Sequence, residues 1–123
     1  MRYIALIAAL LLLTGLLLAQ TYSEELEELA LAGDPVAQND LGQCYEKGKG
    51  VTADAEEAIR WYQLAADKGH MDGQYNLGRM LYHGTDPGQD NAEAVVWLRK
   101  AAEQGHSDAQ NYLGVCYQNG QGV

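Results

Sequence analysis

The chain is short of the residues on which several classes of protein depend. Its 123 residues hold only two cysteines, and 8 Lys and Arg stand against 17 Asp and Glu, for a formal net charge of −9. A surface this acidic is repelled by phosphate backbones and anionic lipid head groups. We therefore do not expect nucleic acid as a partner. Two cysteines are too few for a disulfide-stapled scaffold. The length suits about one domain.

The motifs of common catalytic, metal and phosphate sites are missing as well. Neither C-x-x-C nor H-E-x-x-H occurs, and His70, His83 and His106 are interpreted as residues at helix turns and ends. The only serines, Ser23 and Ser107, lie in neither S-x-x-K nor G-x-S-x-G. The glycines recur at helix ends and crossings instead of forming a phosphate loop. We therefore expect no catalytic residues, no metal and no cofactor.

The N-terminus has the composition of an export signal. Arg2 precedes an uncharged, Leu-rich run over residues 4–19, and polar residues follow it. The run has the length of a signal-peptide core and is shorter than the roughly 20 residues of a membrane-spanning helix. Ala19 suits the position before a cleavage site, although Leu17 stands where a small residue is usual. We predict a signal peptide over residues 1–19, with an uncleaved membrane anchor over residues 4–19 as the alternative.

The rest of the chain repeats with a period of 36 residues and without gaps. A fixed period in the range of about 20 to 50 residues indicates a solenoid, in which each unit buries its apolar face against its neighbours. The residues that recur in three copies include Gly33, Gly69 and Gly105; Gln38, Gln74 and Gln110; Leu41, Leu77 and Leu113; and Gly42, Gly78 and Gly114.

Each unit is predicted to contain two helices. Apolar residues follow the helical period over residues 35–47, and Gly48 ends that helix. A second helix starts at Asp54, three residues before Glu57. Side chains at this spacing can accept hydrogen bonds from the free backbone N–H groups at a helix start. Gly42 lies inside the first helix, where it costs up to about 1 kcal/mol relative to Ala. Its recurrence predicts that the partner helix approaches closely at this position.

Both ends of the array depart from the repeat. Residues 20–32 align with the end of a second helix, and we predict an N-terminal capping helix there that starts with a Thr21–Glu24 capping pair. The units that follow are 33–68, 69–104 and a partial unit over 105–123. We expect the chain to be a piece of a longer array; otherwise the helix over residues 107–118 would offer an apolar face to another chain.

The repeated pattern can be compared with known repeats. A-x-x-x-L-G-x-x-Y-x-x-G-x-G-V, followed by D-x-x-E-A-x-x-W-Y-x-x-A-A-x-x-G, resembles the Sel1-like repeat, a relative of the tetratricopeptide repeat, over residues 33–123. The first copy carries it as Ala37, Leu41, Gly42, Tyr45, Gly48, Gly50, Val51, Asp54, Glu57, Ala58, Trp61, Tyr62, Ala65, Ala66 and Gly69.

The resemblance implies a fold and a class of function. The implied fold is all-α, a right-handed α-solenoid of antiparallel helix pairs. The implied function is a non-catalytic protein–protein interaction scaffold, exported to the bacterial periplasm or secreted. Two alternatives stay open: a hydrolase of cell-wall or β-lactam amides, as described for some cysteine-rich members, and a purely structural part of a longer array.

The two cysteines occupy equivalent positions in the first and third units. Packed helices lie roughly 8 to 10 Å apart, so Cys44 and Cys116 are expected to exceed the roughly 7 Å Cα separation that a disulfide allows. We interpret both as small apolar residues in or near the core, with an intermolecular bridge as the alternative. One branch of the family has a cysteine pair within each repeat, and this chain lacks its second member.

The resemblance also implies a binding face. In related repeats the first helices line the concave face, and their non-core positions contact a ligand. Amide and aromatic side chains suit the binding of a peptide or protein segment, and the alternative at each position is an ordinary solvated surface. Arg79 is the only positive charge in the set, so the expected partner is neutral, basic or apolar. The candidates are Asn39, Asp40, Gln43, Tyr75, Asn76, Arg79, Tyr82, Asn111, Tyr112 and Val115, with Glu46 on the same face.

Overall fold

A computed structural model describes residues 22–83 and 91–120, and in these residues it contains six α-helices and no strand. The predicted signal peptide lies outside the described residues. Within the two described ranges, no helix has both the length and the apolar character needed to cross a bilayer. The helices are α2 (Glu24–Leu31), α3 (Pro35–Lys47), α4 (Ala55–Asp67), α5 (Met71–Tyr82), α6 (Asn91–Glu103) and α7 (Ser107–Asn119).

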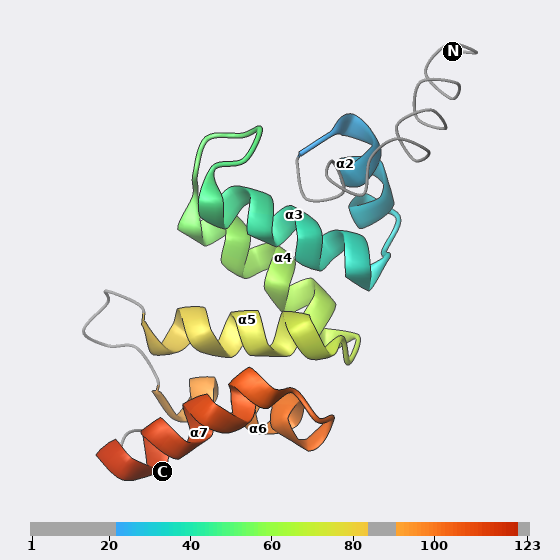
Figure 1. The fold of residues 1–123 in the computed structure, drawn as a ribbon. Coiled ribbons are helices and arrows are strands. Elements are labelled where there is room, and N and C mark those ends of the chain that lie inside the picture. Colours follow the sequence, from blue (N-terminus) through green and yellow to red (C-terminus); the bar gives the residue numbers. More distant parts are fainter. Residues whose placement is uncertain (1–21, 84–90, 121–123) are drawn as a thin grey trace.

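The helices stack one after another along a single axis, from α2 at the top of Figure 1 to α7 at the bottom. The most extensive contacts join α3 to α4 and α5 to α6, and each helix pair also packs on the next. The core is a series of apolar clusters along the stack, one near Leu41, one near Leu77 and one near Leu98. Because the core advances along the stack and has no single centre, the predicted all-α solenoid is confirmed.

Local capping groups set the helix boundaries where the sequence predicts them. The Asp34 carboxylate accepts a hydrogen bond from the Val36 N–H at 3.0 Å, and Gly48 ends α3 with a φ of 68°. The Asp54 carboxylate accepts from the N–H groups of Glu56 and Glu57 at 3.1 and 3.2 Å. These bonds satisfy backbone donors that have no partner inside a helix. Asp90, which precedes α6, lies outside the described residues.

The start of α2 differs from the prediction. The helix begins at Glu24, and its N-cap is Ser23, whose hydroxyl accepts a hydrogen bond from the Leu26 N–H at 3.1 Å. The predicted Thr21–Glu24 capping pair is therefore wrong, because Glu24 is the first helical residue and not the third. Three glutamates in the first turn still interact favourably with the positive N-terminal end of the helix dipole.

The recurrent glycine of each first helix was predicted to allow close packing, and two copies confirm it. A Cβ atom at Gly42 would lie 2.7 Å from the Tyr62 ring, and one at Gly78 would lie 2.8 Å from Leu98 Cγ. At Gly114, a Cβ would meet nothing within 4 Å among the described residues. The expected close contact is therefore wrong for the third copy, because no helix follows α7 in the described part of the chain.

The recurrent glutamine joins one unit to the next. In all three copies its side-chain amide donates to a carbonyl oxygen eight residues earlier, at the end of the preceding helix. The pairs are Gln38 with Ala30 at 3.1 Å, Gln74 with Ala66 at 3.5 Å, and Gln110 with Ala102 at 3.2 Å. The same side chain thus satisfies a helix C-terminus at each junction.

Both cysteines lie in the core. Cys44 and Cys116 are fully buried, and neither forms a disulfide within the described residues. Burial raises the pKa of both thiols, which keeps them protonated. The prediction that they are core residues and do not bond to each other is confirmed.

Candidate functional site

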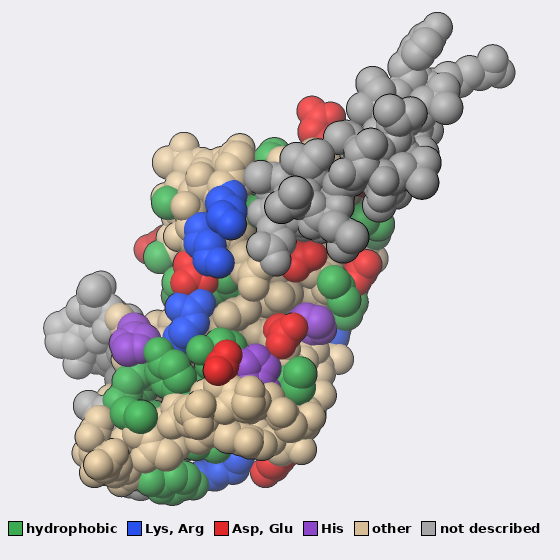
Figure 2. Space-filling view, viewed as in Figure 1, with side chains coloured by type: hydrophobic (Ala, Val, Ile, Leu, Met, Phe, Trp, Pro, Cys, Tyr) green, Lys and Arg blue, Asp and Glu red, His purple; other side chains and the backbone are tan. Residues whose placement is uncertain are grey.

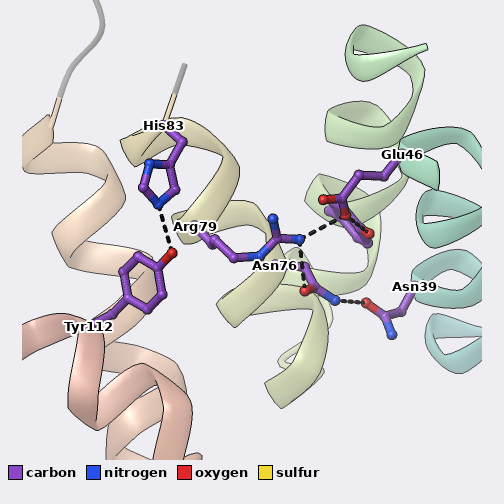
Figure 3. A network of polar contacts seen from close by, with 7 residues as sticks. Asn39, Glu46, Asn76, Arg79, His83 and Tyr112 are labelled. Carbon is purple, nitrogen blue, oxygen red and sulfur yellow. Dashed lines mark hydrogen bonds and ion pairs between the residues drawn. The ribbon is translucent and has the colours of Figure 1, made fainter. Parts of the chain in front are cut away.

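The first helices α3, α5 and α7 bring the predicted binding residues together. α3 contacts α5 directly, and α5 contacts α7, although α4 and α6 intervene in the sequence. Figure 3 shows that side chains from all three helices point toward one another across these junctions. The face is therefore continuous, and it divides into a polar network and an aromatic cluster.

The polar network centres on the Glu46 carboxylate. Its Oε1 atom accepts hydrogen bonds from Arg79 Nη2 at 2.7 Å and from the Tyr62 hydroxyl at 2.6 Å. Burial acts to raise the pKa of Glu46, but the hydrogen bonds from Arg79 and Tyr62 outweigh it and hold that pKa below its usual value. Burial and the bond to Glu46 raise the pKa of Tyr62. The network thus joins α3, α4 and α5 and neutralises the charge of Arg79.

An amide pair continues this network into the interior. Asn76 Nδ2 donates to Asn39 Oδ1 at 2.9 Å, and Arg79 Nη2 donates to Asn76 Oδ1 at 3.4 Å. Asn39 is 4% exposed and Asn76 is 6% exposed. The expectation that these two asparagines occupy non-core positions is wrong: they are buried, and a hydrogen bond from Asn76 to Asn39 links their side chains between α3 and α5.

Five side chains of α5 and α7 and their caps form what we call the aromatic cluster: Tyr75, Tyr82, His83, His106 and Tyr112. Tyr112 lies at its centre, with ring centroids 5.9 Å from Tyr75 and 6.1 Å from Tyr82 in edge-to-face geometry. Its hydroxyl is 2.7 Å from His83 Nε2, and Tyr75 stacks on His106 at 4.3 Å. The three tyrosines are only partly buried, so they offer apolar ring surface with polar edges.

The remaining candidates lie around these two groups. Asp40 and Gln43 are partly buried on α3, whereas Asn111 and Val115 are exposed on α7. Burial raises the pKa of Asp40, while His70 acts to lower it. In Figure 2, hydrophobic side chains gather over α5 and α7, beside histidine and acidic side chains.

The sequence analysis missed the partners that complete the site. The three histidines lie at helix ends as predicted, but His83 and His106 also contact tyrosines of the face. Glu46 and Arg79 are 33 residues apart, close to one period, which is the spacing that could have indicated a contact between neighbouring first helices. In the described part of the chain, no group of three or more His, Cys, Asp or Glu side chains could hold a metal ion.

The stacked helix pairs and the continuous face define a helical repeat protein of the α-solenoid class. The model of the Sel1 repeat matches residues 35–70, 72–106 and 107–123, so the chain belongs to the Sel1 repeat family. Members of this family are commonly protein-interaction scaffolds. The three matched segments begin two or three residues after the starts of the predicted repeat units at Gly33, Gly69 and Gly105.

Several solved structures are similar to this chain, and two crystal structures illustrate the likeness. A protective antigen present in uropathogenic Escherichia coli strains, which displays an SLR fold, is 40% identical with a TM-score of 0.75. The alignment covers 81% of this chain, which spans only 21% of the antigen. A Sel1 repeat protein from Oxalobacter formigenes is 36% identical with a TM-score of 0.69, over 80% of this chain and 74% of that one. Among curated proteins, no sequence matches.

Proposed function

We propose that the protein is a non-catalytic scaffold that binds a peptide or protein segment along the face of α3, α5 and α7. The aromatic cluster is the observation that carries this proposal. Tyrosines supply large contact area at low cost in conformational entropy, and they are enriched at the energetic centres of interfaces. Tyr75, Tyr82 and Tyr112 are held in place by one another, so little order is lost when a partner binds.

The charges of the face define the partner that suits it. Arg79 is paired with Glu46, so it does not provide a free anchor for an acidic segment. The partly buried Asp40 and the net charge of −9 favour a segment that is neutral, basic or apolar. Apolar side chains of the partner would pack on the aromatic cluster, while Gln43 and Asn111 would bind its backbone.

The binding face is tested by selection of peptides from a random library on the purified protein. Binding of the selected peptides is then compared in Tyr75→Ala and in Tyr117→Ala, a matched control that removes an exposed tyrosine outside the aromatic cluster. We expect Tyr75→Ala to weaken binding about tenfold or more, as for a residue at the centre of an interface. Equal binding by both variants would contradict the assignment.

We propose further that the chain is exported. The support is the composition of residues 1–19, which combines one basic residue with a Leu-rich run and a small residue at position 19. Expression with a C-terminal tag, followed by cell fractionation and N-terminal sequencing, tests it. The expected result is a protein outside the cytoplasm that begins at Gln20. An intact N-terminus in the membrane fraction would support the anchor instead.

A further inference from the structure

His106 connects the start of α7 to the aromatic cluster through three contacts. Its Nδ1 atom accepts a hydrogen bond from the Ala109 N–H at 3.1 Å and thereby caps α7. Its Nε2 atom lies 3.2 Å from Asp72 Oδ1, and its ring stacks on Tyr75 with centroids 4.3 Å apart. The His106 side chain is only 12% exposed, so its neighbours largely enclose the ring.

The cap bond of α7 fixes the protonation state of this ring. An imidazole nitrogen that accepts a hydrogen bond carries no proton, so the hydrogen of the neutral ring is on Nε2, where it can be donated to Asp72. A second proton would occupy Nδ1 and point at the Ala109 N–H, and two donors cannot bond to one another. The imidazolium form of His106 is therefore incompatible with the cap of α7.

The charged groups near His106 do not outweigh the loss of this cap. Asp72 on α5 and Asp108 in the first turn of α7 would attract an imidazolium, but both side chains are exposed, and exposed pairs contribute little to stability. Positive charge is unfavourable both at a helix N-terminus and when it is buried. The charged residues near the end of α6 are Lys100 and Glu103, and neither forms an ion pair with His106 in the described residues.

The polar and titratable groups of the aromatic cluster itself do not respond to acid in this way. Burial raises the pKa of Tyr75, so that ring stays neutral, and the Arg79 guanidinium already lies 6.0 Å from its centre. His83 Nε2 lies 2.7 Å from the Tyr112 hydroxyl (Figure 3). A protonated His83 can still donate to that oxygen, so its contact survives protonation.

The two equivalent positions in the earlier units differ from His106. Asp34 caps α3 with a carboxylate, which accepts a hydrogen bond from the Val36 N–H. His70 precedes α5 in the same way, but its side chain makes no cap hydrogen bond. Of these three described N-cap residues, only His106 combines an imidazole cap with a stacked tyrosine of the binding face.

We propose that His106 is a pH-sensitive positioning residue of the binding face, which holds Tyr75 and the start of α7 in place at neutral pH and releases both on protonation. The inference rests on the proposed function, because it concerns the regulation of the same face. Histidine is the side chain whose charge changes between about pH 5 and 8. Once the ring has turned away, Tyr75 loses its stacking partner, and a partner protein has to order it again on binding. The face therefore binds its partner at neutral pH and releases it in mild acid.

Two measurements on the purified protein test the inference, each at pH 7.5 and pH 5.5. NMR spectroscopy follows, without any partner, the hydrogen-bonded Ala109 amide and the nuclear Overhauser contact between the His106 and Tyr75 rings. Fluorescence anisotropy measures the affinity for an N-acetylated peptide selected on the protein from the library, chosen to lack His so that its own charge stays constant. We expect acidification to remove both NMR signals and to weaken peptide binding about tenfold, as for loss of a tyrosine at the centre of an interface.

Two variants assign the effect to a single proton. In His106→Asn the cap is kept, because asparagine is a good N-cap, and its amide does not titrate. The Ala109 amide should then stay hydrogen-bonded at both pH values, and the ratio of the two peptide affinities should fall from about ten to near one. His70→Asn is the matched control, since it removes the histidine from the equivalent position one unit earlier and should keep the tenfold ratio.

Three results would overturn the inference: NMR contacts of His106 that persist at pH 5.5, equal peptide affinity at both pH values, or the same affinity ratio in His106→Asn as in the parent. Equal affinity at both pH values would leave the proposed function standing. If no library peptide binds at either pH, the proposed function fails, and the NMR measurement still decides whether protonation releases Tyr75.

Discussion

At the scale of single residues, the same glycine has opposite consequences in different units. Gly42 and Gly78 lie under side chains of the next helix, whereas Gly114 lies in the open. Sequence repetition predicts that the three positions are equivalent, and it does so correctly for the backbone. It cannot predict the difference in packing, because that depends on which helix lies opposite each glycine.

Alanine substitution should reveal this difference. Gly42→Ala places a methyl group 2.7 Å from the Tyr62 ring and should lower the free energy of unfolding by about 1 to 3 kcal/mol. Gly114→Ala meets no neighbour and should raise it by up to about 1 kcal/mol, since alanine favours the helix. Urea denaturation of the two variants measures both changes, and effects of the same sign would contradict the packing described for α7.

The Glu46 network predicts a dependence of stability on pH. The pKa of Glu46 is below its usual value of 4.5 in the folded protein, so its contribution is complete above that pH. The contribution is lost as the pH falls through the folded-state pKa. Glu46→Gln should therefore be less stable than the parent at pH 7, by on the order of 1 kcal/mol.

The pH comparison contains its own control. As the pH falls through the folded-state pKa, the Glu46 carboxyl of the parent takes up a proton and resembles the amide, so the difference between parent and Glu46→Gln should shrink. Thermal unfolding at a series of pH values from 7 downward measures it. A difference that stays constant over the whole series, down to the pH at which the parent unfolds, would show that the carboxylate charge does not stabilise the network.

At the scale of helices, sequence analysis predicted the boundaries well because the signals are local. Asp34, Gly48 and Asp54 act within a few residues of their own positions, and α3 has the bounds predicted for it. The start of α2 was missed because Thr21 and Ser23 are both suitable caps by residue type, whereas the chain beside the actual cap is held by a tertiary contact, the hydrogen bond from the Tyr22 N–H to the Lys49 carbonyl. The contacts of the face were missed for a similar reason: Glu46 and Arg79 meet only because their helices pack.

The cap of α4 can be tested at this scale. Asp54→Ala removes the acceptor for two backbone N–H groups, so it should cost about 0.5 to 2 kcal/mol of stability. Arg60→Ala, which removes an exposed ion pair on the same helix, is the control and should change stability by less than about 1 kcal/mol. Equal losses in thermal unfolding would argue against capping as the source of the effect.

At the scale of the whole molecule, order should decrease toward α7. In a solenoid each helix is stabilised mainly by its neighbours, and among the described helices α7 packs against α6 and only slightly against α5. Amide hydrogen exchange measured by NMR should therefore be faster in α7 than in α4 or α5, which are covered on both sides. Uniform exchange along the stack would mean that the molecule unfolds only as one cooperative unit.

The glutamine bonds at the junctions have a consequence for how such proteins evolve. Gln38, Gln74 and Gln110 each bond to a carbonyl group of the helix that precedes their own. The first and second units thus each carry the donor for the junction before them and the acceptor for the junction after them. A unit added by duplication would bring both the glutamine donor and the carbonyl acceptor with it. The array can therefore gain or lose whole units without any new contact between neighbouring units having to evolve.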